Sequence, residues 1–168
     1  HNPVSNLKLA SGVSPVPKLL EAGLTVALGT DSSCSNNAAD MFEVMKIAGL
    51  LHKGVSKNPT LVPAEKALRM ATIEGAKALL WEEKIGSIEV GKEADLAIID
   101  FRKPHLSPVF NETSHIVYSA KAADVDTVLV KGKVVMENRK VTTVDVNRVM
   151  RMAEKAKEKL LVKLQAEK

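Results

Sequence analysis

The apolar positions of the chain change their spacing along its length. A continuous apolar run at 24–29 follows Gly23 and ends in the polar stretch that contains Asp31, which is typical of a strand buried on both faces of a parallel sheet. The segment 13–22 precedes it, with proline near its start, and predicts a short helix. A short helix, a glycine and a buried strand in this order indicate an α/β protein.

Two longer helices are predicted next. The first runs over 39–53, with the Ser-Asn-Asn at 35–37 as its N-cap and Gly54 as its end. The second runs over 63–80. Each has an apolar side at helical spacing, made of Met41, Met45, Ala48 and Leu51 in the first helix and of Ala67, Leu68, Ala71, Ala78 and Leu79 in the second.

The pattern changes after Trp81. Turn glycines at 86 and 91 lead to a predicted buried strand at 95–101 and a proline-bearing loop at 102–114. Two further strands are predicted around Lys131-Gly132, which is a hairpin signal. A helix over 145–166 then begins at Asp145, and its apolar stripe consists of Val149, Ala153, Ala156, Leu160 and Leu164. The chain therefore divides into an α/β part, a mostly β part and a terminal helix.

Composition and charge exclude several classes of protein. The 168 residues are 45% apolar and 26% charged, as in globular proteins, and no apolar run is long enough to span a bilayer. Seven basic and four acidic residues in 145–168 supply +3 of the net charge of +4, and only five residues are aromatic, so we expect no nucleic-acid partner. Cys34 has no possible disulfide partner, which favours the cytoplasm. The opening His-Asn-Pro has no features of a signal peptide and predicts a fragment or a processed product.

Asp31 is the principal candidate for chemistry. It follows the predicted strand directly, where active-site loops of parallel α/β sheets lie. Small neighbours allow the backbone to approach a ligand closely. A carboxylate in this position can bind a metal, accept a proton, or cap the next helix or turn, and spacing alone favours capping.

The sequence contains no second metal ligand at a recognisable spacing. None of the four histidines, at 1, 52, 105 and 115, belongs to a His-x-His or His-x-x-x-His pair. We expect structural or solvated roles for them, with His52 near a helix end where the dipole favours positive charge. Cys34 lacks a neighbouring histidine and is expected to be inert. There is also no glycine-rich phosphate loop.

Four collinear stretches nevertheless resemble the amidohydrolase superfamily, in the branch of the 5′-methylthioadenosine/S-adenosylhomocysteine deaminases, near triazine chlorohydrolases and guanine deaminases. They are "HNPVSNLKLASG", "GLTVALGTDSSCSNNAADMFEVMK", "ALRMATIEGAKALLWEEKIGSIEVGKEADLAIIDF" and "HIVYSAKAADVDTVLVKGKVVMENRKV". Together they cover nearly the whole chain. The last of them resembles the final strands of the family's β-domain.

The resemblance implies the C-terminal part of a (β/α)8 barrel, carrying strands 7 and 8, at 1–81. It further implies part of a β-sandwich at 82–143, and 144–168 is then a C-terminal amphipathic helix. His1 would lie at the end of barrel strand 7 and Asp31 at the end of strand 8. The family's other metal ligands and its proton-handling glutamate would precede residue 1. We expect a homo-oligomer in the full-length form.

The implied activity is hydrolytic deamination of adenine nucleosides by one divalent metal, with Zn²⁺ expected and Fe²⁺ or Mn²⁺ as alternatives. The metal would lower the pKa of its bound water, and the hydroxide would attack C6 of the adenine ring. Asp31 would bind the metal and substrate and carry a proton from the water to the departing ammonia. Ser35 is a candidate substrate contact. His1, Asn6 and Lys8 are expected to have structural or indirect roles.

Two alternatives remain beside this hypothesis. A guanine deaminase or a chlorohydrolase would use Asp31 in the same way. The chain could instead be the remnant of an enzyme, without catalytic activity, that folds or oligomerises through its β-domain and terminal helix. The metal content and turnover of the intact protein distinguish such a remnant from an enzyme.

Overall fold

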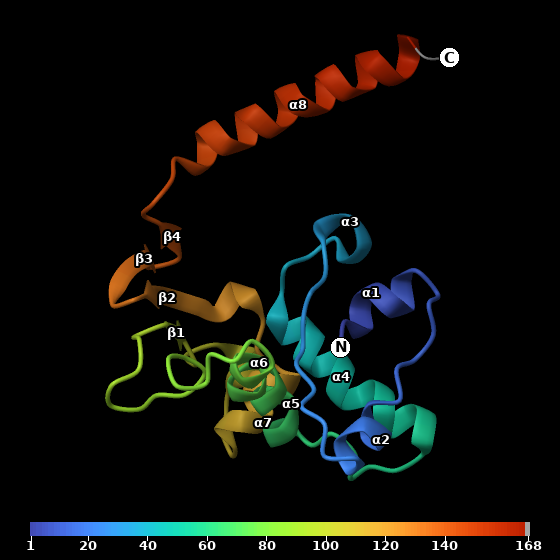
Figure 1. Cartoon of the computed structure of the whole chain (residues 1–168). Helices are drawn as coiled ribbons and strands as arrows, with labels where there is room; N and C mark the ends of the chain where they lie inside the picture. The colour runs from blue at the N-terminus through green and yellow to red at the C-terminus, as the bar shows by residue number, and fades with distance from the viewer. Residues whose placement is uncertain (167–168) are drawn as a thin grey trace.

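The computed structural model describes residues 1–166 and consists of a helical part, a small sheet and a long terminal helix (Figure 1). The helical part contains α1 (Pro3–Lys8), α2 (Val16–Glu21), α3 (Ser33–Asn36), α4 (Met41–Ser56), α5 (Ala64–Ala71) and α6 (Ile73–Ala78). The second part contains β1 (Leu96–Ile99), η1 (Pro104–Leu106), α7 (Glu112–Tyr118), η2 (Ala122–Asp124), β2 (Val125–Val130), β3 (Lys133–Glu137) and β4 (Lys140–Val141), and α8 (Val146–Ala166) follows. None of the described helices is long and apolar enough to cross a membrane.

The segment 24–30 links α2 to the loop before α3 and does not belong to the four-stranded sheet. The sequence predicted a strand buried on both faces, but Val26 alone is buried in this segment and Leu24 is 55% exposed. A strand needs neighbours on both sides to satisfy its backbone and cover its side chains. Among residues 1–166 no sheet surrounds this segment. The segment therefore has the sequence pattern of a buried strand but does not form one.

One short contact nevertheless has the geometry of a parallel sheet. The amino group of His1 donates to the carbonyl of Ala27 at 2.6 Å, and the amide of Gly29 donates to the carbonyl of His1 at 3.1 Å. The two hydrogen bonds flank Leu28, which is the pattern of neighbouring parallel strands. This contact places the start of α1 beside the end of the apolar segment.

Helix α4 begins and ends later than its sequence predicted. The cap is Asp40, whose carboxylate accepts the amides of Phe42 and Glu43 at 2.8 and 3.3 Å. The expected cap at 35–37 was wrong because these residues lie in or directly after α3, which ends at the left-handed Asn37. Gly54 lies within α4 and does not end it, and the left-handed Lys57 follows the last turn.

The helix predicted over 63–80 is two helices. Thr72 separates α5 from α6 with φ −126° and ψ −99°, and its hydroxyl donates back to the carbonyl of Leu68 at 2.8 Å. Threonine side chains compete in this way with the helical hydrogen bonds. The break turns the end of the apolar pattern outward, and Leu79 is 63% exposed.

The core lies where α2, the 24–30 segment, α4, α5 and α7 meet. It consists of the buried residues Val16, Val26, Met45, Val62, Ala67, Met70 and Val117. Lys53 of α4 crosses its edge and donates to the carbonyl of Val62 at 2.8 Å and to the hydroxyl of Tyr118 at 3.0 Å. Gly49 admits the Tyr118 ring, because a Cβ there would lie 3.3 Å from it. These contacts fix α7 against α4.

The sheet is antiparallel throughout, in the order β1-β2-β3-β4. The predicted hairpin at Lys131-Gly132 is confirmed, and both residues have positive φ, as a type I′ turn requires. The strand predicted at 95–101 is shorter, at Leu96–Ile99. The expectation of strands from "HIVYSA" onward was wrong for residues 115–118, which belong to α7, and this helix begins at Glu112 within the expected loop. Asn111 caps this helix by accepting the amide of Ser114 at 2.7 Å.

The terminal helix agrees with the sequence in its bounds but not in its packing. Asp145 caps it by accepting the amide of Arg148 at 3.0 Å, and the helix continues to Ala166. No residue of α8 is buried, and Figure 1 shows it projecting from the sheet. Its apolar stripe therefore contacts no other element within the part of the chain that the structure describes.

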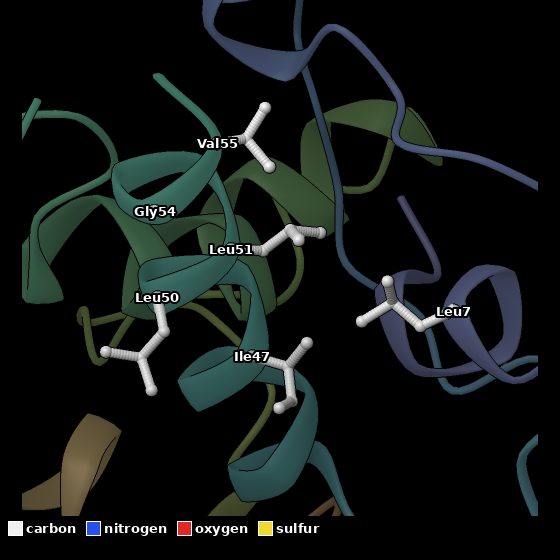
Figure 2. Close-up of a pocket in the computed structure, with 6 residues that line it drawn as sticks. All are labelled: Leu7, Ile47, Leu50, Leu51, Gly54 and Val55. Atoms are coloured by element: carbon white, nitrogen blue, oxygen red, sulfur yellow. The ribbon is translucent and has the colours of Figure 1, made fainter. Parts of the chain in front are cut away.

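A second apolar surface lies between α1 and α4. Figure 2 shows Leu7 of α1 across from the side chains of α4, and the groove is lined by Leu7, Ile47, Leu50, Leu51, Gly54 and Val55. Leu50 and Val55 are 47% and 62% exposed. Contiguous exposed apolar side chains of this kind usually face another protein segment. Asp31 does not line this groove.

Gly86 provides a test of the junction between the helical part and the sheet. A Cβ at Gly86 would lie 2.7 Å from Cβ of Ala76 on α6, and the backbone has φ +95°. Gly91 has nearly the same φ, +96°, with nothing within 4 Å of its Cβ position. We expect Gly91→Ala to lower the free energy of unfolding by about 1 kcal/mol through backbone strain. Gly86→Ala should lower it by about 1–3 kcal/mol more, because it also overpacks α6.

Chemical denaturation of the two variants beside the parent protein measures this difference. Equal losses for Gly86→Ala and Gly91→Ala would contradict the close packing of the junction on α6.

Candidate functional site

Asp31 lies at the end of the apolar segment and before α3, with its side chain exposed. Its backbone is left-handed, with φ +61°, which aspartate adopts more readily than most residues but still at a cost. Strained backbone of this kind often occurs at functional positions. The sequence prediction that the apolar segment presents this carboxylate at its end is consistent with this position.

Hydrogen bonds from α1 and from its own loop hold the carboxylate. Ser5 of α1 donates its hydroxyl to Oδ2 at 2.6 Å, and the amide of Ser32 donates to Oδ1 at 2.8 Å. Hydrogen bonds from Ser5, from Ser35 and from the Ser32 amide lower the pKa of Asp31 below its ordinary value. The group is therefore a carboxylate at neutral pH, exposed to receive a cation. Spacing alone favoured capping for Asp31, but Ser32 occupies the N-cap position of α3, and within the described residues it makes no side-chain capping hydrogen bond.

The loop after Asp31 is held by its own polar side chains. Ser35 is buried, and its hydroxyl donates to the carbonyl of Ser32 at 3.1 Å. Asn36 is also buried and donates its side-chain amide to the carbonyl of Thr30 at 2.7 Å. Lys8 of α1 reaches the carbonyl of Cys34 at 3.3 Å. Ser35 thus lies beside the carboxylate, and its contact with a substrate stays a prediction.

His1 and His52 form a pair that the sequence did not indicate. Their Nε2 atoms are 3.1 Å apart, so one ring donates to the other, and the ring centroids are 5.1 Å apart. His52 is buried within the helical part, and burial lowers its pKa and favours the neutral ring. His52 therefore packs inside the protein and is not a positive charge at a helix end. The pair has a structural role, because it joins α4 to the residues just before α1.

The remaining candidates lie apart from Asp31. His105 contacts the buried Asp124 at 2.9 Å, and His115 bonds to the carbonyl of Asn111 at 2.9 Å. Cys34 is exposed and free, 2.9 Å from the hydroxyl of Ser32. Within residues 1–166 no three His, Cys, Asp or Glu side chains lie close enough to hold a metal ion. Asp31 by itself could supply an oxygen ligand to a divalent cation.

Ser5 is the site residue that the sequence analysis missed. It lies 26 positions before Asp31, in the motif for which only Asn6 and Lys8 were expected to have structural or indirect roles. The usable signal was the spacing of Asn2, Ser5 and Lys8, since residues three apart share a helix face.

Comparison with known proteins identifies the class. Residues 1–135 match the model of the amidohydrolase family. The chain belongs to the amidohydrolase family, which confirms the superfamily that the four motifs indicated.

Two curated relatives narrow the branch. A 5-methylthioadenosine/S-adenosylhomocysteine deaminase of Thermoanaerobacter pseudethanolicus is 53% identical over 96% of this chain and 37% of its own length. A 5′-deoxyadenosine deaminase of Methanosarcina acetivorans is 51% identical over 99% of this chain and 38% of its own length. The predicted branch is thereby confirmed. The chain spans little more than a third of the length of these relatives.

Solved structures agree on the fold. An adenosine deaminase from Xanthomonas campestris with bound zinc superposes with a TM-score of 0.94 and 37% identity, over 96% of this chain and 37% of that one. An atrazine chlorohydrolase from Arthrobacter aurescens complexed with zinc superposes with a TM-score of 0.83 and 27% identity, over 90% of this chain and 34% of that one. The predicted fold class, part of an amidohydrolase α/β fold, is confirmed.

The left-handed backbone at Asp31 predicts a difference between two variants that both lack the carboxylate. Asp31→Gly relieves the strain, whereas Asp31→Ala keeps a Cβ at φ +61°. We expect the glycine variant to be more stable by about 1 kcal/mol in the metal-free protein. Thermal unfolding with excess chelator measures this, and an alanine variant at least as stable as the glycine variant would argue against the strained conformation.

Proposed function

We propose that this chain is the C-terminal part of a metal-dependent deaminase of adenine nucleosides. The substrates are 5′-methylthioadenosine, S-adenosylhomocysteine, 5′-deoxyadenosine or adenosine, and the products are ammonia and the inosine analogue. The observation that carries the proposal is identity above 50% to two such deaminases over nearly the whole chain. The exposed, ionised Asp31 supports it, because a metal ligand must be deprotonated to bind.

The proposed organisation places part of the barrel at 1–81, part of a β-sandwich at 82–143 and an amphipathic helix at 144–168. The barrel assignment is supported by the parallel contact of His1 with the 24–30 segment, as between adjacent barrel strands. The β-sandwich assignment is supported by the antiparallel sheet of β1 to β4. The apolar groove in Figure 2 and the exposed Leu24 fit helices and strands that continue into the rest of a barrel.

The role of Asp31 follows from its hydrogen bonds. An ionised carboxylate offers about four lone-pair positions, and Ser5 and Ser32 occupy one on each oxygen. The remaining lone-pair capacity of this exposed carboxylate would let Asp31 bind a cation and accept a proton from the attacking water. A divalent ion, for which we propose Zn²⁺, would supply activation of that water when bound. Ser35 is the proposed substrate contact of the same loop.

A chlorohydrolase is the second candidate, because an atrazine chlorohydrolase shares this fold at 27% identity. The lower identity ranks it after the deaminases. We further propose that the full-length protein is a cytoplasmic homo-oligomer. The free Cys34 favours a reducing compartment, and the uncovered apolar stripe of α8 favours association.

The test is ammonia release by the full-length protein from each of the four nucleosides, together with its metal content. We expect about one divalent ion per chain and turnover of at least one of these substrates. Asp31→Ala should reduce metal content strongly and abolish turnover, because it removes both a ligand and the proton acceptor. Release of chloride from a chlorotriazine without ammonia from nucleosides would favour the second candidate.

The control is Asp40→Ala, which removes a carboxylate that caps α4 and accepts the amide of Ala122 at 3.3 Å. It should lower stability and leave metal content unchanged. Full metal content and undiminished turnover in Asp31→Ala would contradict the proposed function.

A further inference from the structure

Helix α1 lies with one polar face along the segment that carries Asp31. Asn2, just before the helix, approaches Gly29 so closely that a Cβ there would lie 2.5 Å from its Oδ1. Ser5 bonds to Asp31, and Lys8 reaches the loop at Cys34. The three residues are spaced by three, so they share one side of the helix. Their partners follow in the same order along the chain, and α1 therefore runs beside the end of the segment and its loop.

Ser5 differs from the other two in burial and in partner. It is 2% exposed, whereas the carboxylate that it binds is at the surface. Its hydroxyl is 2.6 Å from Oδ2, the length of a charge-assisted hydrogen bond. The other hydrogen bonds to the carboxylate come from its own loop, from the Ser32 amide to Oδ1 at 2.8 Å and from Ser35. Among these donors, Ser5 alone ties the carboxylate to a separate helix.

We propose that Ser5 is a positioning residue for Asp31, which fixes the direction of the carboxylate that would bind the metal and accept a proton from the reacting water. This inference rests on the proposed function. An exposed aspartate has rotamer freedom about both side-chain torsions, and a bond from a buried donor on a separate element removes it. Partners behind a metal ligand commonly act in this way.

The alternative is that Ser5 only attaches α1. The other contacts of the helix argue against it, because Lys8 also reaches the loop, and the backbone of His1 pairs with Ala27 and Gly29. Removal of one hydroxyl therefore leaves α1 docked and releases the carboxylate.

The experiment uses the full-length protein with Ser5→Ala, Ser5→Thr and the control Ser11→Ala. Ser11 follows α1 and is exposed, and its side chain has no hydrogen bond to the described residues. Zn²⁺ affinity is measured by competition with a chelator, kcat and KM are measured with the best substrate, and thermal unfolding is measured with excess chelator. We expect Ser5→Ala to weaken Zn²⁺ binding about 10- to 100-fold and to lower kcat with little change in KM. Ser5→Thr, which keeps the hydroxyl, should restore most of both, and Ser11→Ala should match the parent.

Three results would overturn the proposal. They are unchanged Zn²⁺ affinity and kcat in Ser5→Ala, a loss that Ser5→Thr shares in full, and a metal-free protein that no longer folds without the hydroxyl, which would make Ser5 a structural residue. A parent protein that binds no Zn²⁺ and deaminates nothing would instead overturn the proposed function. The two failures are therefore distinguishable.

Discussion

The backbone pairing of His1 with the residues around Leu28 is the constraint on which the site depends. Two hydrogen bonds of 2.6 and 3.1 Å join the start of α1 to the apolar segment. His1 lies two residues before α1, and because a helix is rigid over its length, fixing its entry also restricts where Ser5 and Lys8 point. The carboxylate of Asp31 is thus positioned from two directions, by the segment that carries it and by the helix beside it.

The buried core and the polar residues around Asp31 lie in different parts of the structure. The buried cluster under α4, α5 and α7, closed by Lys53 and Tyr118, contains no group that could react. Polar side chains that hydrogen-bond one another gather instead at the end of the apolar segment, around Asp31. Folds commonly place functional groups on loops that a packed scaffold holds, since loops can vary without loss of the core.

Several apolar surfaces of the chain are exposed. Leu24, the groove of Figure 2 and the stripe of α8 are exposed, while this chain spans only 37% of the first curated relative. The high structural similarity to a zinc-containing deaminase, at a TM-score of 0.94, means that the same arrangement occurs inside a much longer chain. Surfaces that are open here are thus of the kind that additional strands and helices cover in an α/β barrel.

Local pattern determined much of this protein. Periodicity and turn residues predicted α4, the hairpin at Lys131-Gly132, α8 with its Asp145 cap, and an acidic residue at the end of an apolar run. These features depend on interactions between residues a few positions apart. Pattern failed for α7 and for the break at Thr72, where packing and a side-chain hydrogen bond outweighed propensity.

Only the tertiary structure decided which distant residues meet. Ser5 and Asp31 are 26 positions apart and His1 and His52 are 51 apart, and no local spacing encodes either contact. Whether the segment 24–30 becomes a strand was also decided there, because a strand exists only when another backbone satisfies its hydrogen bonds. The sequence by itself therefore specified the carboxylate, and the docking of α1 gave that carboxylate its direction.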